Sequence, residues 1–251
     1  MRRILLVMVF ILGVLKIGLK DQYISWDDDP NLDQIPPGSV IPDNPPQPSR
    51  GVVDNDGYEN FYLGTDFAEP HITMNPKDPK QSFTAYNTNA VHATINGYEW
   101  FSNTPNFGVS LSGDPVTAYD SLGNLYYENM RNVGGSIVGT QIIKSTNNSQ
   151  TWEASVSGNT GNDKNWIEED KTGGTYANYI YSTMTPGNVV RSTNLGASFN
   201  IVFSASNNLP GMMVAVGANG SISGGSVYVV TNTGGSTTPV FTIYRSTNGG
   251  G

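Results

Sequence analysis

Residues 145–152 read STNNSQTW, and residues 192–199 read STNLGASF. The pattern begins again at residues 246–251, which read STNGGG, and a more divergent copy, TINGYEWF, spans residues 94–101. The first residues of the four copies are separated by 51, 47 and 54 positions. A period of about 40 to 50 residues is typical of four-stranded propeller blades. The spacing therefore predicts one blade for each copy.

A second block repeats in the same register, and each of its copies has an apolar strand, a turn and another strand. The copies begin at Ala68, Gly113, Asp163 and Leu209. Their β-prone segments are bounded by Gly, Asn, Asp or Pro, and none has a 3.6-residue apolar period. The sequence therefore predicts an all-β domain over residues 61–251. We expect a β-propeller of four-stranded antiparallel blades, with about four blades present.

The first repeat has the chemistry of a tight turn. Asparagine accepts backbone N–H groups a few residues further on, glycine supplies a positive φ, and serine or threonine adds a local hydrogen bond. The aromatic residue that ends each copy buries a large apolar surface between blades. We assign this structural role to Thr94, Asn96, Phe101, Ser145, Asn147, Trp152, Ser192, Asn194, Gly196, Phe199, Ser246 and Asn248.

These copies resemble the Asp-box, whose family pattern is roughly S-x-D-x-G-x-T-W, as found in sialidases and related secreted propellers. Asparagine stands in place of the aspartate in every copy, and glycine is kept at Gly196 and Gly250 but replaced at Tyr98 and Ser149. The resemblance implies a BNR-repeat protein of the sialidase superfamily, similar to exo-alpha-sialidases. It implies a complete ring of six or seven blades, so we expect this sequence to be a propeller truncated at its C-terminus. It also implies that the boxes lie away from the binding pocket.

The N-terminal residues indicate export. Arg2 and Arg3 precede an apolar run that extends from Ile4 to Leu15. This run is shorter than the ~20 residues of a spanning helix, and the pattern predicts a signal peptide or an N-terminal anchor over residues 1–20. Residues 21–60 are rich in Pro and Asp, which predicts an extended linker. We therefore expect a secreted or cell-surface protein with no membrane contact other than such an anchor.

Composition excludes several classes of function. The formal net charge is −8, and no basic cluster follows the terminal arginines, so nucleic acid is not an expected partner. The absence of cysteine excludes disulfides, thiolate metal sites and a cysteine nucleophile. His71 and His92 are too few and too isolated for a zinc site, and the acidic run at 27–29 lacks the spacing of a calcium loop. We expect no metal and no cofactor.

The arginines give little support to sialidase activity. The resemblance implies three arginines that hold the substrate carboxylate, together with a tyrosine nucleophile and an acid/base aspartate. After residue 50 the only arginines are Arg131, Arg191 and Arg245. The last two directly precede their boxes, where Lys144 holds the equivalent place, so we interpret them as strand-edge residues. No catalytic residue is assigned.

Acidic residues open successive first strands of the second repeat. Glu69, Asp114 and Asp163 are separated by 45 and 49 positions. Equivalent strand starts in a propeller point to the same rim of the central channel, so we expect these carboxylates to converge there. The candidate binding residues are Glu69, His71, Asp114, Asp163, Lys164 and Trp166. The alternative is that each acidic side chain only caps the turn of its own strand.

Three functions remain open on the sequence. The first is a glycan-directed propeller, either enzymatic or lectin-like, with a pocket on the channel axis. The second is a non-enzymatic extracellular scaffold that binds protein partners. The third is hydrolysis of a different glycoside.

Overall fold

The computed structural model describes residues 52–53, 59–61, 63, 68–235 and 237–251. The expected signal peptide or anchor, 1–20, and most of the expected linker, 21–60, lie outside the described residues. At the end of that linker, β1 (Val52–Val53) pairs antiparallel with β2 (Glu59–Asn60), so this part contains paired strands. No described segment forms a helix of the length and apolarity needed to cross a membrane.

From β3 onward the chain forms four antiparallel sheets of consecutive strands, of which the first three have four strands and the last has three. Strand order in each sheet follows chain order, because turns connect antiparallel neighbours. The first two sheets contain β3 (His71–Met74), β4 (Ser82–Tyr86), β5 (Ala90–Thr94), β6 (Trp100–Phe101), β7 (Ser110–Tyr119), β8 (Leu125–Val133), β9 (Ser136–Ser145) and β10 (Val156–Ser157). The last two contain β11 (Asp163–Glu169), β12 (Ile180–Thr185), β13 (Asn188–Ser192), β14 (Asn200–Ser204), β15 (Met213–Asn219), β16 (Ile222–Asn232) and β17 (Phe241–Ser246).

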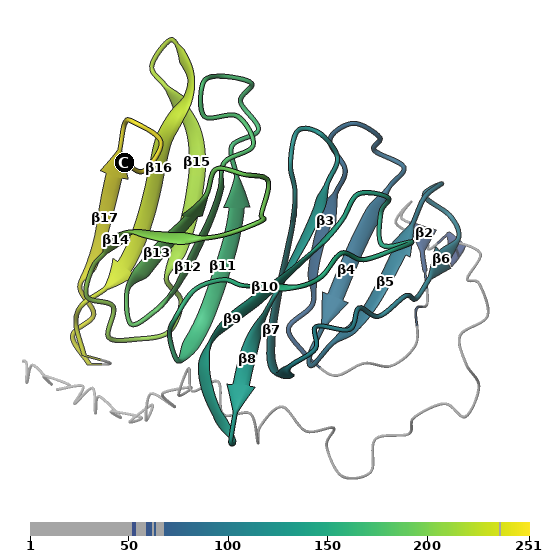
Figure 1. The fold of residues 1–251 in the computed structure, drawn as a ribbon, viewed down its shortest axis with the longest axis horizontal. Coiled ribbons are helices and arrows are strands. Elements are labelled where there is room, and N and C mark those ends of the chain that lie inside the picture. The colour runs from purple at the N-terminus through teal and green to yellow at the C-terminus, as the bar shows by residue number, and fades with distance from the viewer. Residues whose placement is uncertain (1–51, 54–58, 62, 64–67, 236) are drawn as a thin grey trace, which may run out of the picture.

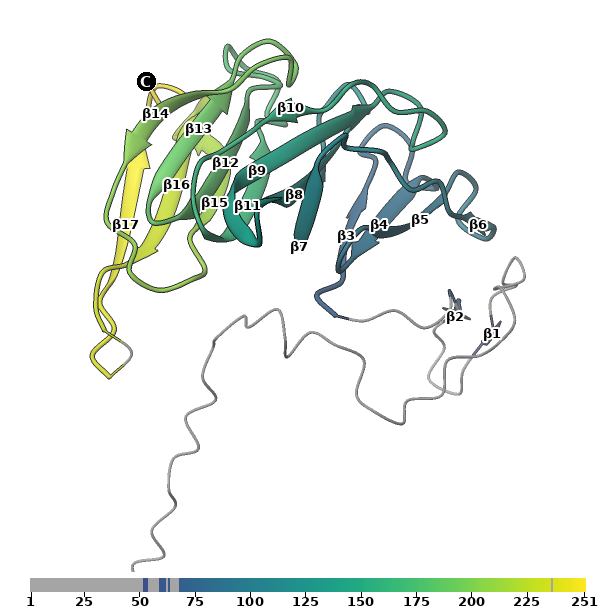
Figure 2. The same ribbon diagram turned by 60° about the horizontal axis from the view of Figure 1, so that its bottom comes forward.

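The four sheets stand side by side in chain order, with the first and last at opposite ends of an arc (Figures 1 and 2). The first strand of each sheet contacts the first strand of the next, so that β3, β7, β11 and β15 form the inner row. Radially arranged antiparallel sheets with adjacent inner strands are propeller blades. The predicted all-β propeller is therefore confirmed.

Three apolar clusters lie between consecutive sheets. Tyr126 and Tyr127 are neighbours on β8, yet Tyr127 belongs to the cluster facing the first sheet and Tyr126 to the cluster facing the third. Successive side chains of a strand point to opposite faces, so one strand supplies both interfaces. The third cluster joins Tyr181 of β12 to Val214 and Val227 of the last sheet. Burial between sheets therefore holds the stack together.

The second copy of the turn is closed by its own side chains. Asn147 Oδ1 accepts a hydrogen bond from the Thr151 N–H at 2.8 Å. Ser145 Oγ accepts one from the Ser149 N–H at 2.9 Å. Asn148 and Ser149 both have a left-handed backbone, with φ of 53° and 63°. The asparagine side chain thus turns onto its own hairpin, as the sequence predicts.

The third copy has the same turn. Asn194 Oδ1 accepts from the Ser198 N–H at 3.1 Å, and Ser192 Oγ accepts from the Gly196 N–H at 3.0 Å. Leu195 and Gly196 are the left-handed pair. Asparagine therefore performs the turn-closing role that the resemblance gives to aspartate.

The first copy is one residue shorter than the others. In the third copy Arg191, the residue before the box serine, pairs with Asn200, whereas in the first copy Ala93, the residue before Thr94, pairs with Phe101. The assignment of Phe101 as the aromatic end of this copy is therefore wrong, and Trp100 holds that place. Phe101 packs instead on the cluster between the first two sheets. Sequence alignment without the register missed the deletion because Trp100 and Phe101 are both aromatic.

A buried carboxyl group ties the second sheet to the third. Glu128 on β8 is fully buried and accepts hydrogen bonds from the Thr140 and Ser182 hydroxyls at 2.7 and 2.6 Å. The Asn165 amide nitrogen donates to its other oxygen at 3.1 Å. Burial raises the pKa of Glu128 to about 7, although these three hydrogen bonds lower it. Glu128 therefore joins two blades by hydrogen bonds, and its burial makes ionisation of the carboxyl group cost free energy.

We expect Trp152→Ala to lower the free energy of unfolding by about 3 kcal/mol. Trp152 packs edge-on against Phe83 of the preceding sheet at 5.6 Å between ring centroids, and its Nε1–H donates to the Asn103 carbonyl at 2.9 Å. Urea denaturation measures the loss. Tyr98→Ala is the control, because Tyr98 is 61% exposed and its removal should change stability by less than about 0.5 kcal/mol. Equal losses in the two variants would contradict an inter-blade role for Trp152.

We expect Glu128→Gln to flatten the pH dependence of stability. A folded pKa of about 7 lies above the ordinary value of 4.5, so folding is favoured while both states are protonated, below about pH 4.5. This contribution is lost as the pH rises through 7, and its full size is about 3 kcal/mol. A glutamine amide never ionises, and once the Asn165 amide has turned over it can donate to the Asn165 Oδ1, which lacks a hydrogen-bond partner in the parent.

Thermal melts from pH 4.5 to 8.5 measure this effect. The variant should match the parent at pH 4.5 and melt at a higher temperature at pH 8.5. Glu153→Gln is the control, since this side chain is 49% exposed and pairs with Lys144 on the surface. A variant that is less stable than the parent at pH 8.5 would show that ionised Glu128 is tolerated.

Candidate functional site

A non-glycine residue with a left-handed backbone stands just before β3, inside β7 and at the second position of β11, so that Asp114 lies within its strand and does not open it. The φ angles are 51° at Glu69, 51° at Asp114 and 35° at Lys164. Such angles are uncommon outside glycine and persist only where the surroundings hold them. The structural equivalent of Glu69 and Asp114 is therefore Lys164, one residue after the Asp163 that sequence spacing selects. The charged side chains of these three strained residues lie together at one rim of the propeller.

The three charges form a compact group. The Lys164 ammonium lies 3.2 Å from Glu69 Oε1 and 3.7 Å from Asp114 Oδ2. The side chain of Asp114 is 3% exposed, whereas those of Glu69 and Lys164 are 19% and 30% exposed. One ammonium therefore pairs with both acidic side chains, and the group is partly exposed to solvent through Glu69 and Lys164.

Asn87, just after β4, holds two of these groups in place. Its amide nitrogen donates to Glu69 Oε2 at 2.7 Å, and its amide oxygen accepts from the Asp114 N–H at 2.7 Å. A Cβ at Gly113 would lie 2.5 Å from that oxygen, so only glycine allows this approach. Sequence reasoning missed Asn87, which ends the first copy of the second repeat, because the next two copies end in methionine. The only local signal is the glycine that precedes Asp114.

The carboxyl groups of the site also interact with each other. Burial raises the pKa of Glu69, but a hydrogen bond with the Asp114 carboxyl group, the Lys164 charge and the Asn87 amide outweigh it and hold the pKa at about 2. Glu69 is therefore ionised throughout the physiological range. Its negative charge is a fixed feature of the rim.

An imidazole and an indole continue the site along the inner strands. His71 and Trp166 meet edge-on, with ring centroids 5.4 Å apart. His71 Nδ1 accepts from the Thr117 N–H at 3.2 Å, which leaves the proton of the neutral ring on Nε2. Burial lowers the pKa of His71, a nearby Glu168 raises it, and Lys164 lowers it further. A groove of about 530 Å³ extends from Trp166 and Glu168 along the last sheet.

Asp163 has a local role at this rim. Its Oδ1 accepts from the N–H of Lys164, the next residue, at 2.8 Å. This is the strand-turn contact that the sequence leaves open as an alternative. The structure thus brings Glu69, Asp114 and Lys164 together, places His71 and Trp166 beside them, and gives Asp163 a part in the backbone turn.

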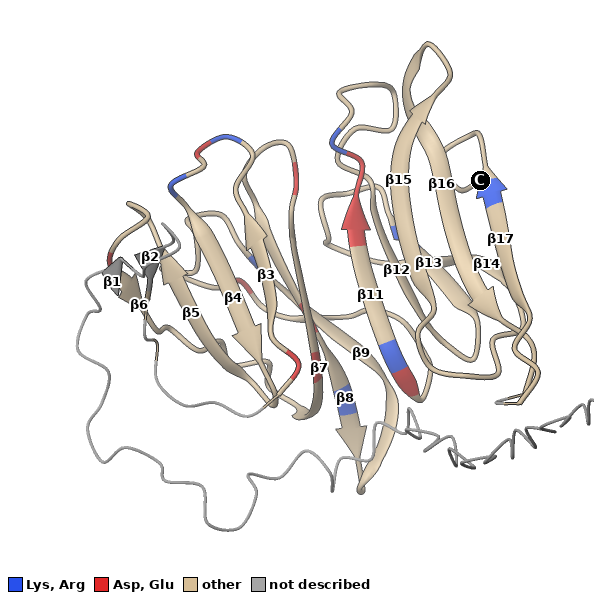
Figure 3. Ribbon diagram, turned by 180° about the vertical axis from the view of Figure 1, so that it is seen from behind, with Lys and Arg blue, Asp and Glu red and all other residues tan. Residues whose placement is uncertain are grey.

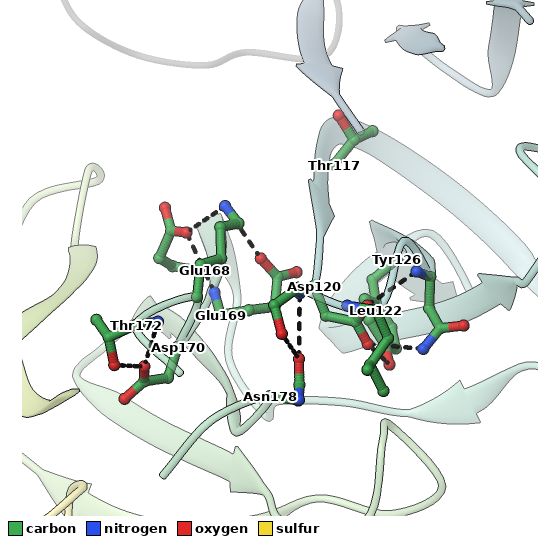
Figure 4. A network of polar contacts seen from close by, with 12 residues as sticks. Thr117, Asp120, Leu122, Tyr126, Glu168, Glu169, Asp170, Thr172 and Asn178 are labelled. Atoms are coloured by element: carbon green, nitrogen blue, oxygen red, sulfur yellow. Dashed lines mark hydrogen bonds and ion pairs between the residues drawn. The ribbon is translucent and has the colours of Figure 1, made fainter. Parts of the chain in front are cut away.

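A second charged group lies at the other end of β11, as Figure 3 shows. The Lys171 ammonium is 2.9 Å from Glu168 Oε1 and 3.5 Å from the buried Glu169 (Figure 4). Burial raises the pKa of Glu169 to about 8, against the Lys171 charge. Asp120 lies close by and accepts from the Leu122 N–H at 2.9 Å. Sequence reasoning missed this group, whose contacts are those of buried turns at the strand ends.

No group of three or more His, Cys, Asp or Glu side chains within the described residues is arranged to hold a metal ion. The positive groups near the rim carboxylates are equally few. Arg191 donates to the Gly249 carbonyl, and Arg245 donates to Asn219 and Ser226. These two arginines are therefore engaged away from the rim, whereas Arg131 of β8 pairs with Leu111 of β7, near Asp114, and its buried Nε has no hydrogen-bond partner in the described part of the chain.

No protein-family model and no curated protein sequence matches the chain. Among solved structures, a Penicillium chrysogenum alpha-L-arabinanase complexed with arabinobiose is 13% identical, with a TM-score of 0.47 over 70% of this chain and 56% of that chain. An exo-beta-1,3-galactanase from Phanerochaete chrysosporium is 9% identical, with a TM-score of 0.46 over 84% and 52%. A Hadza microbial sialidase is 12% identical, with a TM-score of 0.41 over 72% and 45%. The chain thus spans about half the length of these structures, and the likeness concerns the fold.

We expect Lys164→Met to raise the pKa of Glu69 from about 2 toward its ordinary value of 4.5. The ammonium favours the ionised carboxylate, and its removal leaves two adjacent acids without a counter-charge. A carboxyl-carbon NMR titration measures the shift. The lowered pKa stabilises the fold above pH 4.5, and this contribution is lost as the pH falls toward 2, so the variant should be less stable than the parent near neutral pH and the difference should shrink on acidification. Lys144→Met, which removes a distant surface pair, should leave the Glu69 titration unchanged.

Proposed function

We propose that the inner rim formed by Glu69, Asp114, Lys164 and Trp166 binds a neutral or amino-substituted glycan, and that the chain is the binding part of an exported, Asp-box propeller of the sialidase type. The observation that carries the proposal is the paired carboxylate and ammonium group beside two half-buried aromatic rings, those of His71 and Trp166. Sugar hydroxyls both donate and accept hydrogen bonds, and their C–H faces pack on aromatic rings. A rim with charged acceptors, a charged donor and an indole offers all three contacts.

The charge balance selects the class of glycan. The Glu69 and Asp114 carboxyl groups share a hydrogen bond, so one proton lies between them, and Lys164 balances the negative charge that remains. An anionic sugar would have to compete with these carboxyl groups for Lys164, and Arg191 and Arg245 are bound elsewhere. A neutral sugar needs no cation, and an amino sugar can pair with the Glu69 carboxylate. The rim therefore favours neutral or amino glycans over sialylated ones.

The distance between the acids favours binding over hydrolysis. Retaining glycosidases place their two carboxyl groups about 5 to 5.5 Å apart, and inverting enzymes about 6.5 to 9.5 Å apart. Glu69 and Asp114 are closer than either arrangement, because their carboxyl groups share a hydrogen bond. We therefore propose a lectin-like role for this rim.

Export and the sialidase-type ancestry are part of the same proposal. The turn contacts at Asn147 and Asn194 support an Asp-box origin, since each closes its hairpin through the side-chain oxygen. The basic and apolar residues at the N-terminus support export. The similar structures include an arabinanase, a galactanase and a sialidase, but the likeness is one of fold, and the rim residues carry the proposal.

An array of neutral, amino and sialylated oligosaccharides tests the proposal. We expect binding to neutral or amino glycans, and calorimetry with the best of them should show at least about tenfold weaker binding for Glu69→Gln and Trp166→Ala. Glu153→Gln, on the surface pair with Lys144, is the matched control and should bind as the parent does. Preference for sialylated glycans, or no binding to any glycan on the array, would show that the rim has another role.

A further inference from the structure

His71 of β3 is held in one tautomer by the backbone of β7. Its Nδ1 accepts a hydrogen bond from the Thr117 N–H at 3.2 Å and lies 3.0 Å from the Thr117 hydroxyl oxygen. A backbone N–H can only donate, so a proton on Nδ1 would face another donor. The ring therefore keeps its single proton on Nε2, and the neutral imidazole is favoured over the cation.

The Nε2–H of His71 is available to a ligand. No hydrogen bond joins it to any other group within the described residues, and Nε2 is not one of the buried atoms that lack a partner. This donor is therefore accessible to solvent. Beside it lies Trp166, whose ring meets the imidazole edge-on at 5.4 Å between ring centroids. The rim thus presents a neutral donor next to a large apolar ring.

Glu69 has room for one more hydrogen bond. An ionised carboxylate offers about four acceptor positions. Its Oε2 accepts from the Asn87 amide at 2.7 Å, and its Oε1 accepts from the Lys164 ammonium at 3.2 Å. The hydrogen bond with the Asp114 carboxyl group uses a third position. The side chain is partly exposed, so a ligand donor can reach the fourth.

These side chains form two pairs between β3 and β11. Glu69 and His71 are two residues apart in the chain, and so are Lys164 and Trp166. Positions two apart along a strand share a face and lie about 6.6 Å from each other. One pair joins the carboxylate to the ammonium, and the other joins the imidazole to the indole. Two hydrogen bonds of about 2.9 Å span most of that separation, which leaves space for one planar amide group.

We propose that the rim recognises an N-acyl amino sugar by its amide group. The Glu69 carboxylate accepts from the amide N–H, the His71 Nε2–H donates to the acyl oxygen, and the Trp166 ring packs on the acyl methyl group. A hydroxyl group offers no such apolar end. A free amine is cationic at neutral pH and would lie beside the Lys164 ammonium, where like charges repel. This inference rests on the proposed glycan-binding function and names the group that selects among glycans.

Calorimetry on the full chain with three tetrasaccharides tests the proposal. Those of β-linked glucose, glucosamine and N-acetylglucosamine share one backbone and differ only in a hydroxyl, amino or acetamido substituent. The acetamido sugar should bind at least about tenfold more tightly than the other two, because it alone makes both hydrogen bonds and the apolar contact. Equal affinities, tighter binding of the amino sugar or no binding of the acetamido sugar would each overturn the inference. The glycan array decides separately whether the rim binds glycans at all.

His71→Phe and His92→Phe are a matched pair of variants. A phenyl ring can keep the edge contact with Trp166 but has no N–H to donate, whereas His92 lies on β5, outside the inner row. His71→Phe should weaken binding of the acetamido tetrasaccharide about tenfold and leave that of the glucose tetrasaccharide within about twofold. His92→Phe should change neither affinity. An acetamido preference that survives in His71→Phe would overturn the role of the imidazole.

A measurement on the parent protein covers the case in which His71→Phe does not fold. The chain has two histidines, so the His92→Phe spectrum assigns the imidazole N–H signals. Saturation with the acetamido tetrasaccharide should shift the His71 Nε2–H proton signal downfield and slow its exchange with water. The glucose tetrasaccharide should do neither. A His71 signal that does not respond to the acetamido sugar would overturn the proposal.

Discussion

Each sheet of this propeller is held to the one before it by a turn that inserts across the gap. In the third and fourth copies the glycine of the left-handed pair lies against a tyrosine ring of the preceding sheet, and in the second copy Trp152 packs against Phe83 of the preceding sheet. A sheet has two apolar faces here, since adjacent residues such as Tyr126 and Tyr127 serve different interfaces. Neither face is stable in water, so each blade depends on its neighbours for burial. The stack is cooperative for this reason.

The repeat explains how much of the fold is visible in the sequence. Turn chemistry is local, so a serine, an asparagine and a left-handed pair recur at a fixed period and identify the blades without any structure. Register is not local. Thr94 pairs with Trp100, and only that pairing shows that the first turn has lost a residue. The choice between two adjacent aromatic residues could not be made from composition, because both suit a buried place.

The candidate site, like the fold, could be predicted only in part from the sequence. Spacing along the chain selects the strand starts, and the strain at Glu69 and Asp114 confirms that these positions are equivalent. Spacing alone does not distinguish Asp163 from Lys164, because both lie within one residue of the expected position. The sequence did not indicate Asn87 or Glu128, since each also bonds to a partner on another sheet that lies far away along the chain. Polar groups that occur once have no period, and their partners become visible only in three dimensions.

Asn87 connects the rim to the interface between the first two sheets through its hydrogen bonds. Its amide spans from the first sheet to the backbone of the second, at the point where Gly113 leaves room for it. Any change in the separation of these two sheets alters the distance between Glu69 and Asp114, because each carboxylate belongs to a different sheet. The pKa of Glu69 depends on that distance through the shared hydrogen bond and through Lys164, which comes from a third sheet. The pKa of the rim carboxyl group therefore depends on the packing of three blades. A ligand that bridges the rim gains affinity only where the turns have already fixed that packing.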